Sequence, residues 1–322
     1  MRLLRRLIIG LAIGVGIPLA IIIYGWVATG PAAKATEFTV AEGSSVSSVA
    51  ADLADTGLIA SASRFKAGAR LFGGGDPVQA GEFEIPKGAS ASAILDLLQH
   101  GRPIQRLITV TEGMPAIIVE ERLAANQFLT GPTPTIAEGT VLPDSYSFER
   151  GEARAKVVAR MQSAMTKTFD MLWAKRKPGC PVTSKQDVIT LASIVEKETG
   201  KPSERRAVAG VYCNRLRIGM KLDADPTVIY PITKGKPLGR RIRRSELMAD
   251  TGYNTYRSPG LPVGPIANPG RDSIAAVLDP EAHKFIYFVA DGTGGHVFAE
   301  TLEQHNANVQ KWYEIRRARG EM

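Results

Sequence analysis

The longest apolar stretch of the sequence comes first, from Leu7 to Ala28, and contains no charged residue. A helix of about 20 apolar residues spans the hydrocarbon core of a bilayer, and aromatic residues such as Tyr24 and Trp26 at its outer end prefer the membrane interface. Because three arginines precede the stretch, the pattern predicts a cytoplasmic tail over 1–6 and one membrane-spanning helix over 7–28. A cleaved signal peptide is the alternative, although its apolar region usually has about 7–15 residues.

After this stretch the chain repeats a small pattern of a short β-rich run, a charged residue, a glycine and an amphipathic segment. The three copies begin with Phe38–Gly43, Phe83–Gly88 and Ile108–Gly113. Alternating apolar and polar residues in the first two runs are typical of half-buried strands, and the apolar spacing after each glycine is that of a helix. The pattern predicts an α+β fold with small strand–helix units over 36–130. The first unit resembles a LysM-type module, which binds polymers of N-acetylglucosamine.

A helix with two carboxylates near its end is the most informative segment. Apolar residues at helical spacing predict a helix that begins at Ser184 or Asp187 and ends at Gly200. On a wheel of 100° per residue, Glu198 falls among aliphatic side chains and Glu196 points about 160° away, so the two cannot flank one bond. Burial disfavours the charged form of a carboxyl group and predicts a raised pKa for Glu198, as a general acid near neutral pH requires. The alternative is that both carboxylates are solvated in the last turn of the helix.

The following segment is rich in glycine, proline, tyrosine and asparagine, which indicates loops. Planar rings, amides and hydroxyls suit the binding of sugars and peptide backbone, while turn chemistry is the simpler alternative for each residue. The candidate substrate-binding residues are Asp225, Tyr253, Asn254, Thr255, Tyr256 and Asn268. Further on, the sequence predicts a strand over His283–Asp291 and a hairpin over Gly292–Ala299.

Composition narrows the possible chemistry. The chain of 322 residues has two cysteines and four histidines, which excludes a multi-cysteine zinc site and nearly excludes a three-histidine site. We therefore expect no metal and no other cofactor. The net charge of +8 favours an anionic partner such as a membrane surface or an acidic polymer, and the predicted topology disfavours nucleic acid. Whether Cys180 and Cys213 form a disulfide is open, because nothing in the sequence shows that their side chains meet.

Six motifs follow one another in a fixed order along most of the chain. They are Ala192–Thr199, Asn214–Met220, Asp225–Tyr230, Tyr253–Tyr256, Gly260–Pro269 and Tyr287–His296. Together they resemble the YceG-like endolytic murein transglycosylases, the MltG family. The resemblance implies a single-pass protein of the bacterial inner membrane, with a LysM-like part and a mixed α+β catalytic domain over 137–322 in the periplasm.

The resemblance also implies an activity. Such an enzyme cuts nascent peptidoglycan glycan strands between N-acetylmuramic acid and N-acetylglucosamine, leaves 1,6-anhydro-N-acetylmuramic ends and so terminates glycan elongation. The family's essential glutamate matches Glu198, which would act first as acid and then as base, without a metal. The implied partners are glycan strands, the inner membrane and peptidoglycan synthases, with no nucleic acid. The basic run Lys234–Arg244 departs from the family pattern and has no assigned role.

Two other functions stay open from the residues. Cys213 with His296 could serve a peptidoglycan transpeptidase, although Cys213 lies on the apolar side of its predicted helix, as a buried structural thiol would. A catalytically inactive peptidoglycan-binding scaffold would fit the LysM-like unit equally well. The products formed from peptidoglycan separate these possibilities.

Overall fold

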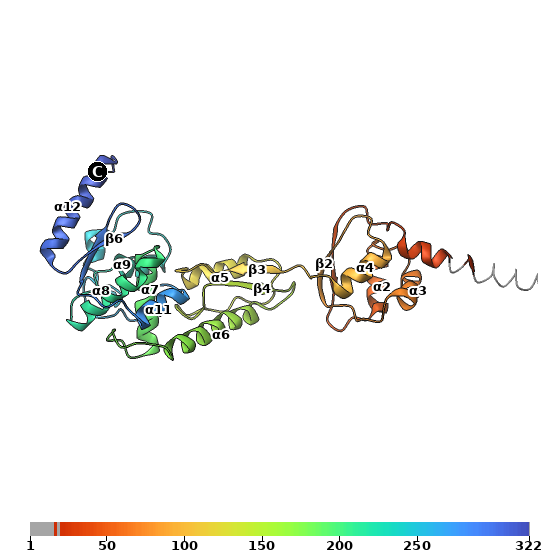
Figure 1. Ribbon diagram of the computed structural model, residues 1–322, viewed down its shortest axis with the longest axis horizontal. Coiled ribbons are helices and arrows are strands. Elements are labelled where there is room, and N and C mark those ends of the chain that lie inside the picture. Colours follow the sequence, from red (N-terminus) through yellow and green to blue (C-terminus); the bar gives the residue numbers. More distant parts are fainter. Residues whose placement is uncertain (1–15, 18–19, 322) are drawn as a thin grey trace, which may run out of the picture. The chain divides into compact units, whose positions relative to one another are not determined.

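The computed structural model describes residues 16–17 and 20–321 (Figure 1). The chain divides into two compact units, with the division after Arg106. Each unit buries its own apolar residues, so each is described by itself.

The N-terminal unit combines one small sheet with several helices. Its elements are β1 (Thr36–Val40), α2 (Val46–Asp55), α3 (Ala62–Phe72), β2 (Gly81–Ile85) and α4 (Ala91–His100). The strands of the first two repeats pair with each other in antiparallel fashion, with Phe38 opposite Phe83. The hydroxyls of Ser45 and Ser90 accept hydrogen bonds from the first turns of α2 and α4, as expected for N-cap serines. The first two sequence repeats therefore build one unit with a shared core.

The structure contradicts the predicted membrane-spanning helix. Within residues 16–17 and 20–321, no helix is both long enough and apolar enough to cross a bilayer. Residues 20–27 are helical, and Trp26 is buried in the N-terminal core, with its ring 5.7 Å from that of Phe65. The rest of the predicted span falls largely outside the described residues. The fold class is corrected to a mixed α+β fold with short two-stranded sheets, and the predicted single-pass location, which rested on that helix, is corrected with it.

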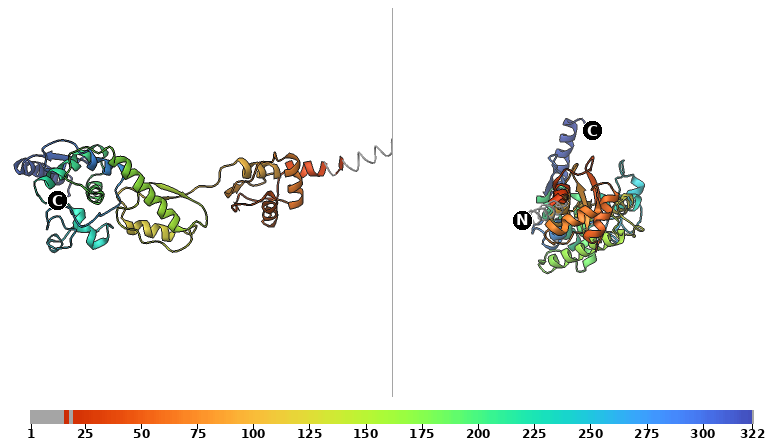
Figure 2. Two further views of the ribbon diagram at one scale, coloured as in Figure 1. Left: turned by 90° about the horizontal axis from the view of Figure 1, so that it is seen from below. Right: turned by 90° about the vertical axis from the view of Figure 1, so that its right-hand side faces the viewer.

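The first layer of the C-terminal unit consists of a small sheet and two helices. Its elements are β3 (Arg106–Thr109), α5 (Ala116–Ala125), β4 (Ser145–Phe148) and α6 (Arg154–Trp173). β3 pairs with β4, and α6 runs along this layer (Figure 2). Val157 and Met161 of α6 share one core with Ile108 of β3 and Leu123 of α5. The third sequence repeat therefore packs with α6 in the C-terminal unit.

The remainder of the C-terminal unit surrounds one central helix, α7. Its elements are α7 (Lys185–Glu198), α8 (Arg205–Arg217), α9 (Asp225–Thr233), α10 (Arg244–Leu247), α11 (Arg271–Leu278), β5 (Tyr287–Ala290), β6 (His296–Ala299) and α12 (Leu302–Ala318). α7 lies against α8 and α11 (Figure 1). β5 and β6 form the antiparallel hairpin that the sequence predicts here, with Tyr287 opposite Ala299. The end of α7 thus lies among α8, α9 and the loops that join them.

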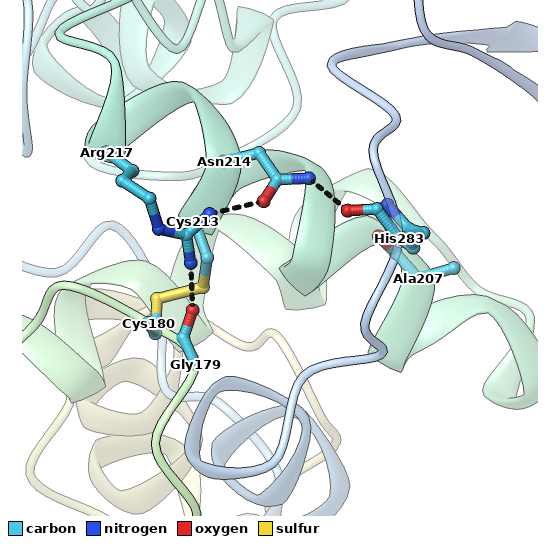
Figure 3. The surroundings of a disulfide bond; sticks show 7 residues. All are labelled: Gly179, Cys180, Ala207, Cys213, Asn214, Arg217 and His283. Atoms are coloured by element: carbon cyan, nitrogen blue, oxygen red, sulfur yellow. Dashed lines mark hydrogen bonds between the residues drawn. A yellow bond between two sulfur atoms is a disulfide. The ribbon is translucent and has the colours of Figure 1, made fainter.

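A disulfide ties the loop after α6 to α8. Cys180 and Cys213 are bonded, with their Cα atoms 4.8 Å apart, and Figure 3 shows this bond in its surroundings. Arg217 Nη2 donates a hydrogen bond to the carbonyl of Gly179 at 2.5 Å, beside the bond. Asn214 donates to two carbonyls of the segment that leads into β5. The question that the sequence left open is settled in favour of a pair, and the pair fixes α8 from one side.

Candidate active site

The helix α7 carries Glu198 at its C-terminal end. Ser184 and Asp187 form a reciprocal capping box: Ser184 Oγ accepts from the Asp187 amide at 3.0 Å, and Asp187 Oδ2 accepts from the Ser184 amide at 3.3 Å. Every residue from Val188 to Val195 is buried. Because α7 is packed on all sides before its last turn, the position of Glu198 is fixed by the core.

The carboxyl group of Glu198 is largely withdrawn from water. Its Oε1 is buried and accepts no hydrogen bond from any described residue. Burial raises the pKa of Glu198 to about 7; a hydrogen bond from the Tyr212 side chain opposes this shift, the charge of Asp225 adds to it, and the charge of Arg215 lowers it. Near neutral pH a large fraction of the molecules therefore carries a proton on Glu198, which is the state of a general acid. The raised pKa of Glu198 agrees with the helical-wheel prediction from the sequence.

Two residues of α8 stand beside this carboxyl group. Tyr212 is fully buried, and burial raises the pKa of its phenol well above the ordinary value, so the hydroxyl keeps its proton and can donate it to Glu198 in a hydrogen bond. Arg215 is also buried; its Nε donates to the carbonyl of Ile286 at 2.6 Å and its Nη1 to that of Leu222 at 2.8 Å. These bonds hold one positive charge near Glu198 without a direct ion pair to it.

Sequence reasoning missed Tyr212 and Arg215. They are three residues apart, so a helix places them on neighbouring positions of one face. The available signal was a tyrosine and an arginine on the side of α8 that faces the core. Apolar spacing alone predicts only packing for this side of the helix.

Asp225 and Tyr256, both predicted as substrate-binding residues, form a hydrogen-bonded pair in electrostatic range of Glu198. Tyr256 Oη donates to Asp225 Oδ1 at 2.7 Å, and this bond together with burial raises the pKa of Tyr256. Asp225 is the first residue of α9 and is exposed. The charge of Glu198 also acts on Tyr256. The pair therefore presents a carboxylate to solvent within electrostatic range of the candidate acid.

Thr255 is buried and holds together the two segments that carry Asp225 and Tyr256. Its Oγ1 accepts from the Ala224 amide at 3.1 Å and lies 2.8 Å from Thr227 Oγ1. The Thr255 amide donates to Thr227 Oγ1 at 3.2 Å. Thr227 lies two residues after Asp225, and Thr255 directly precedes Tyr256. The two threonines therefore hold the start of α9 at a fixed distance from the loop that carries Tyr256.

The other predicted binding residues hold backbone in place. Asn254 is buried, and its Nδ2 donates to three carbonyls at the end of α10, at 2.8–3.3 Å. Asn268 is fully buried; its Oδ1 accepts from the Val141 amide at 3.2 Å and its Nδ2 donates to the Met114 carbonyl at 2.9 Å. Of the predicted binding residues, Asp225 and Tyr256 therefore lie in electrostatic range of Glu198. The side-chain amides of Asn254 and Asn268 instead hydrogen-bond backbone groups.

Tyr253 lies partly buried against the core of the C-terminal unit. Its ring packs on Tyr230 of α9 at 4.8 Å between centroids. Burial raises the pKa of Glu138 to about 7, and an interaction with the Tyr230 side chain opposes this shift. Glu138 Oε1 accepts from the Ala116 amide at 2.9 Å, at the first turn of α5, so this carboxyl group has a structural task.

Glu196, the second carboxylate of the helix end, has a structural partner. Its Oε1 lies 3.2 Å from Arg205 Nη2, and its Oε2 accepts from the Gly270 amide at 2.8 Å, at the start of α11. The side chain is 4% exposed. Arg205 also contacts Glu112 at 2.6 Å. Glu196 therefore joins α7 to α8 and α11, on the side away from Glu198.

We expect Glu196→Gln to lower stability while each folded molecule keeps its activity. Removing one member of a buried ion pair costs about 3–5 kcal/mol when the other charge is left alone, and because Glu112 still faces Arg205, we expect roughly 1–3 kcal/mol here. Thermal melting and a rate corrected for the folded fraction measure both effects. A variant with wild-type melting and no activity would assign Glu196 to the chemistry instead.

Comparisons with known proteins show the family of this chain. The profile of the YceG-like family matches residues 38–311, a range that includes every side chain described in this site. The chain belongs to the YceG-like family. It is 30% identical over 330 residues to an endolytic murein transglycosylase of Bacillus subtilis, with 90% of this chain and 89% of that protein aligned.

Two further relatives extend the comparison of this YceG-like chain. An endolytic murein transglycosylase of Streptococcus pneumoniae is 28% identical over 319 residues, which cover 84% of this chain and 57% of that protein, so the chain spans little more than half of the pneumococcal sequence. The crystal structure of a YceG-like protein from Listeria monocytogenes matches with a TM-score of 0.54 and 25% identity, over 85% of this chain and 98% of that one.

The cysteine chemistry considered as an alternative does not fit this YceG-like protein. A cysteine nucleophile must be a free thiolate, whereas Cys213 is bonded to Cys180 and no cysteine of the described residues is free. His296 Nδ1 lies 2.9 Å from Glu204 Oε2. The transpeptidase alternative is therefore wrong.

Proposed function

We propose that this protein is an endolytic murein transglycosylase, which cleaves glycan strands of peptidoglycan between N-acetylmuramic acid and N-acetylglucosamine and leaves 1,6-anhydro ends. The observation that carries the proposal is the carboxyl group of Glu198, whose Oε1 is buried and unpartnered among the described residues and whose pKa is raised to about 7. The names of the relatives from Bacillus subtilis and Streptococcus pneumoniae support the same substrate.

In the first half of the reaction Glu198 is the general acid. Its proton passes to the glycosidic oxygen as the bond between that oxygen and C1 of the muramic residue breaks. The buried Tyr212 hydroxyl can donate a hydrogen bond to the carboxyl group, and such a bond would stabilise the carboxylate that remains more than the neutral acid. The positive charge that develops at C1 is met by the carbonyl oxygen of the substrate's own 2-acetamido group.

In the second half Glu198 is the general base. The C6 hydroxyl of the same muramic residue bonds to C1 through its oxygen, and its proton returns to Glu198. The carboxyl group is then protonated again, and no water is consumed. A pKa near 7 suits both roles, because the group must give and take a proton with similar ease.

A hydrolase with two carboxyl groups is the nearest alternative among glycan-cleaving enzymes. Inverting and retaining hydrolases place these groups on either side of the bond. Glu196 cannot serve as the second group, since both of its oxygens are engaged by Arg205 and Gly270. The geometry of the helix end therefore favours chemistry that needs one proton carrier.

Mass spectrometry of the products tests the proposed function. The full chain, incubated with purified peptidoglycan, is expected to shorten glycan strands from within and to create 1,6-anhydro-muramic ends, which are one water lighter than reducing ends. Reducing ends would indicate a hydrolase. Unchanged glycan strands would indicate a binding scaffold.

Two finer expectations stay predictions. One is an association with peptidoglycan synthases, and the other is glycan binding by the N-terminal unit, in which β1 pairs with β2 and α4 contacts β2. Binding of soluble glycan fragments to the full chain, with a change in melting temperature as the readout, would address the second.

A further inference from the structure

The reaction proposed above needs a group that stabilises positive charge, in addition to its single proton carrier Glu198. When the 2-acetamido carbonyl oxygen bonds to C1, the positive charge spreads to the amide nitrogen and its N–H becomes a strong hydrogen-bond donor. A carboxylate placed at that N–H stabilises the charge and also holds the acetamido group in the reactive orientation. A residue in this role must offer a carboxylate oxygen that is unoccupied, open to the substrate and in the surroundings of Glu198.

Asp225 meets these requirements. Its Oδ1 is occupied by the hydroxyl of Tyr256 at 2.7 Å, while its Oδ2 has no hydrogen-bond partner among the described residues. The side chain is exposed, so a substrate can reach it. Because one oxygen is held by the tyrosine, the direction of the free oxygen is set before any substrate arrives.

The other carboxylates near Glu198 fit less well. Asp223 is partly exposed, and its Oδ2 lies 3.9 Å from Arg215 Nη1, so its carboxylate already pairs with that guanidinium. Glu196 is engaged on the opposite side of α7. Asp225 is thus the carboxylate within electrostatic range of the candidate acid that combines exposure with a free oxygen.

The scaffold behind Asp225 and Tyr256 suits a residue whose position matters. The buried pair Thr227–Thr255 links the first turn of α9 to the loop that carries Tyr256. The Tyr256 amide donates to Asn254 Oδ1 at 3.0 Å. Buried side-chain hydrogen bonds of this kind fix a functional group more closely than a solvated loop does.

We propose that Asp225, oriented by Tyr256, is a second catalytic residue, which accepts a hydrogen bond from the N–H of the muramic 2-acetamido group. The inference rests on the proposed function and assigns a role within it. As Glu198 protonates the departing oxygen, the acetamido carbonyl oxygen bonds to C1, and Asp225 stabilises the charged ring that forms. When the C6 oxygen bonds to C1, the bond from the carbonyl oxygen breaks and the proton returns to Glu198. Asp225 neither gains nor loses a proton.

The test compares three variants of the full chain. Asp225→Asn removes the proposed acceptor, Tyr256→Phe removes its orienting bond, and Asp223→Asn is the charge-matched control. Asp223 has left-handed backbone geometry, with φ of 47°, which asparagine also tolerates. We expect Asp225→Asn to lower kcat for release of anhydro products by about 100- to 1,000-fold from about pH 5 to about pH 8. Tyr256→Phe should lower it by about 10-fold and Asp223→Asn by less than about 3-fold.

Binding of a stable analogue separates the proposed contact from a general effect of charge. A thiazoline derivative of N-acetylmuramic acid, protonated on its ring nitrogen, imitates the charged ring formed by the acetamido group and keeps its N–H. We expect the wild type and Glu198→Gln to bind it alike, and Asp225→Asn to bind it about 10- to 100-fold more weakly, because a hydrogen bond to a charged acceptor is lost.

Three results would overturn the inference. Wild-type rates for Asp225→Asn at low pH would show that Asp225 only shifts the titration of Glu198. Unchanged thiazoline binding would show that Asp225 does not touch the acetamido group. If Asp225→Asn does not fold, Tyr256→Phe decides, and wild-type kcat and thiazoline binding in that variant would count against the proposal. Absence of anhydro products from the wild type is a separate outcome, which would overturn the proposed function itself.

Discussion

Glu198→Gln is expected to lower the release of anhydro-muropeptides by about 10,000-fold or more, while the protein stays folded. General acid–base catalysis contributes roughly 100- to 10,000-fold, and one group here carries out both proton transfers. Glutamine keeps the shape and a polar head but transfers no proton. The measurement is mass spectrometry of products from purified glycan, with Glu196→Gln as the matched control on the same helix. Near-wild-type activity in Glu198→Gln would remove Glu198 from the mechanism.

The pH dependence of the same variant supplies its folding control. Burial raises the pKa of Glu198 from an ordinary 4.5 to about 7, so the folded protein holds this proton over a pH window in which the unfolded chain has already lost it. The contribution of Glu198 to stability therefore falls as pH rises from about 4.5 to 7. Glutamine does not ionise, so Glu198→Gln should gain melting temperature relative to the wild type across this window. A difference that does not change with pH would mean that the carboxyl group is solvated.

Removal of the disulfide is expected to have the second largest effect, on stability. Cys180 and Cys213 are 33 residues apart, and closing a loop of that size stabilises a protein by about 3–4 kcal/mol in the chain-entropy description. For a unit of this size we expect the double variant Cys180→Ser, Cys213→Ser to melt roughly 10 °C lower. Calorimetry with and without dithiothreitol measures the effect.

Dithiothreitol should lower the melting temperature of the wild type toward that of the double variant and leave the variant unchanged. Activity at low temperature should survive in part, because Tyr212 stays in the same core. Equal melting of oxidised and reduced wild type would show that the bond adds no stability.

The helix that carries Glu198 was predictable, because its apolar face, its capping serine and its terminal glycine all point to one interpretation. The periodicity also separates Glu196 from Glu198, and the structure places the two on different sides of α7. Here local pattern and burial agree.

α9 was not predictable in the same way. It contains Pro231 in its interior, and an internal proline removes a helical hydrogen bond. The helix is stabilised by the tertiary packing of its buried residues Thr227, Val228 and Tyr230. Intrinsic helix propensity does not include such packing. The position of Asp225 at the start of a helix was therefore not available from the sequence.

The roles of Asn254 and Asn268 show a second limit. Both stand in glycine- and proline-rich loops, where an amide can bind a sugar or satisfy backbone groups. The structure buries these loops, and buried backbone carbonyls and amides need partners. Whether a loop is covered depends on contacts with distant segments, such as Met114 and Val141 for Asn268, and these contacts leave no pattern near the asparagine.

The middle of α8 makes the active site sensitive to chain length. Tyr212, Cys213, Asn214 and Arg215 are consecutive, and each turns about 100° from the one before. Tyr212 faces Glu198 at the end of α7, and Cys213 is bonded to the loop after α6. Asn214 donates to the segment before β5, and Arg215 donates to that segment and to the loop before α9. A substitution disturbs one of these four attachments, whereas inserting or deleting one residue rotates all four out of register at once. We therefore expect α8 to tolerate replacements more readily than insertions or deletions.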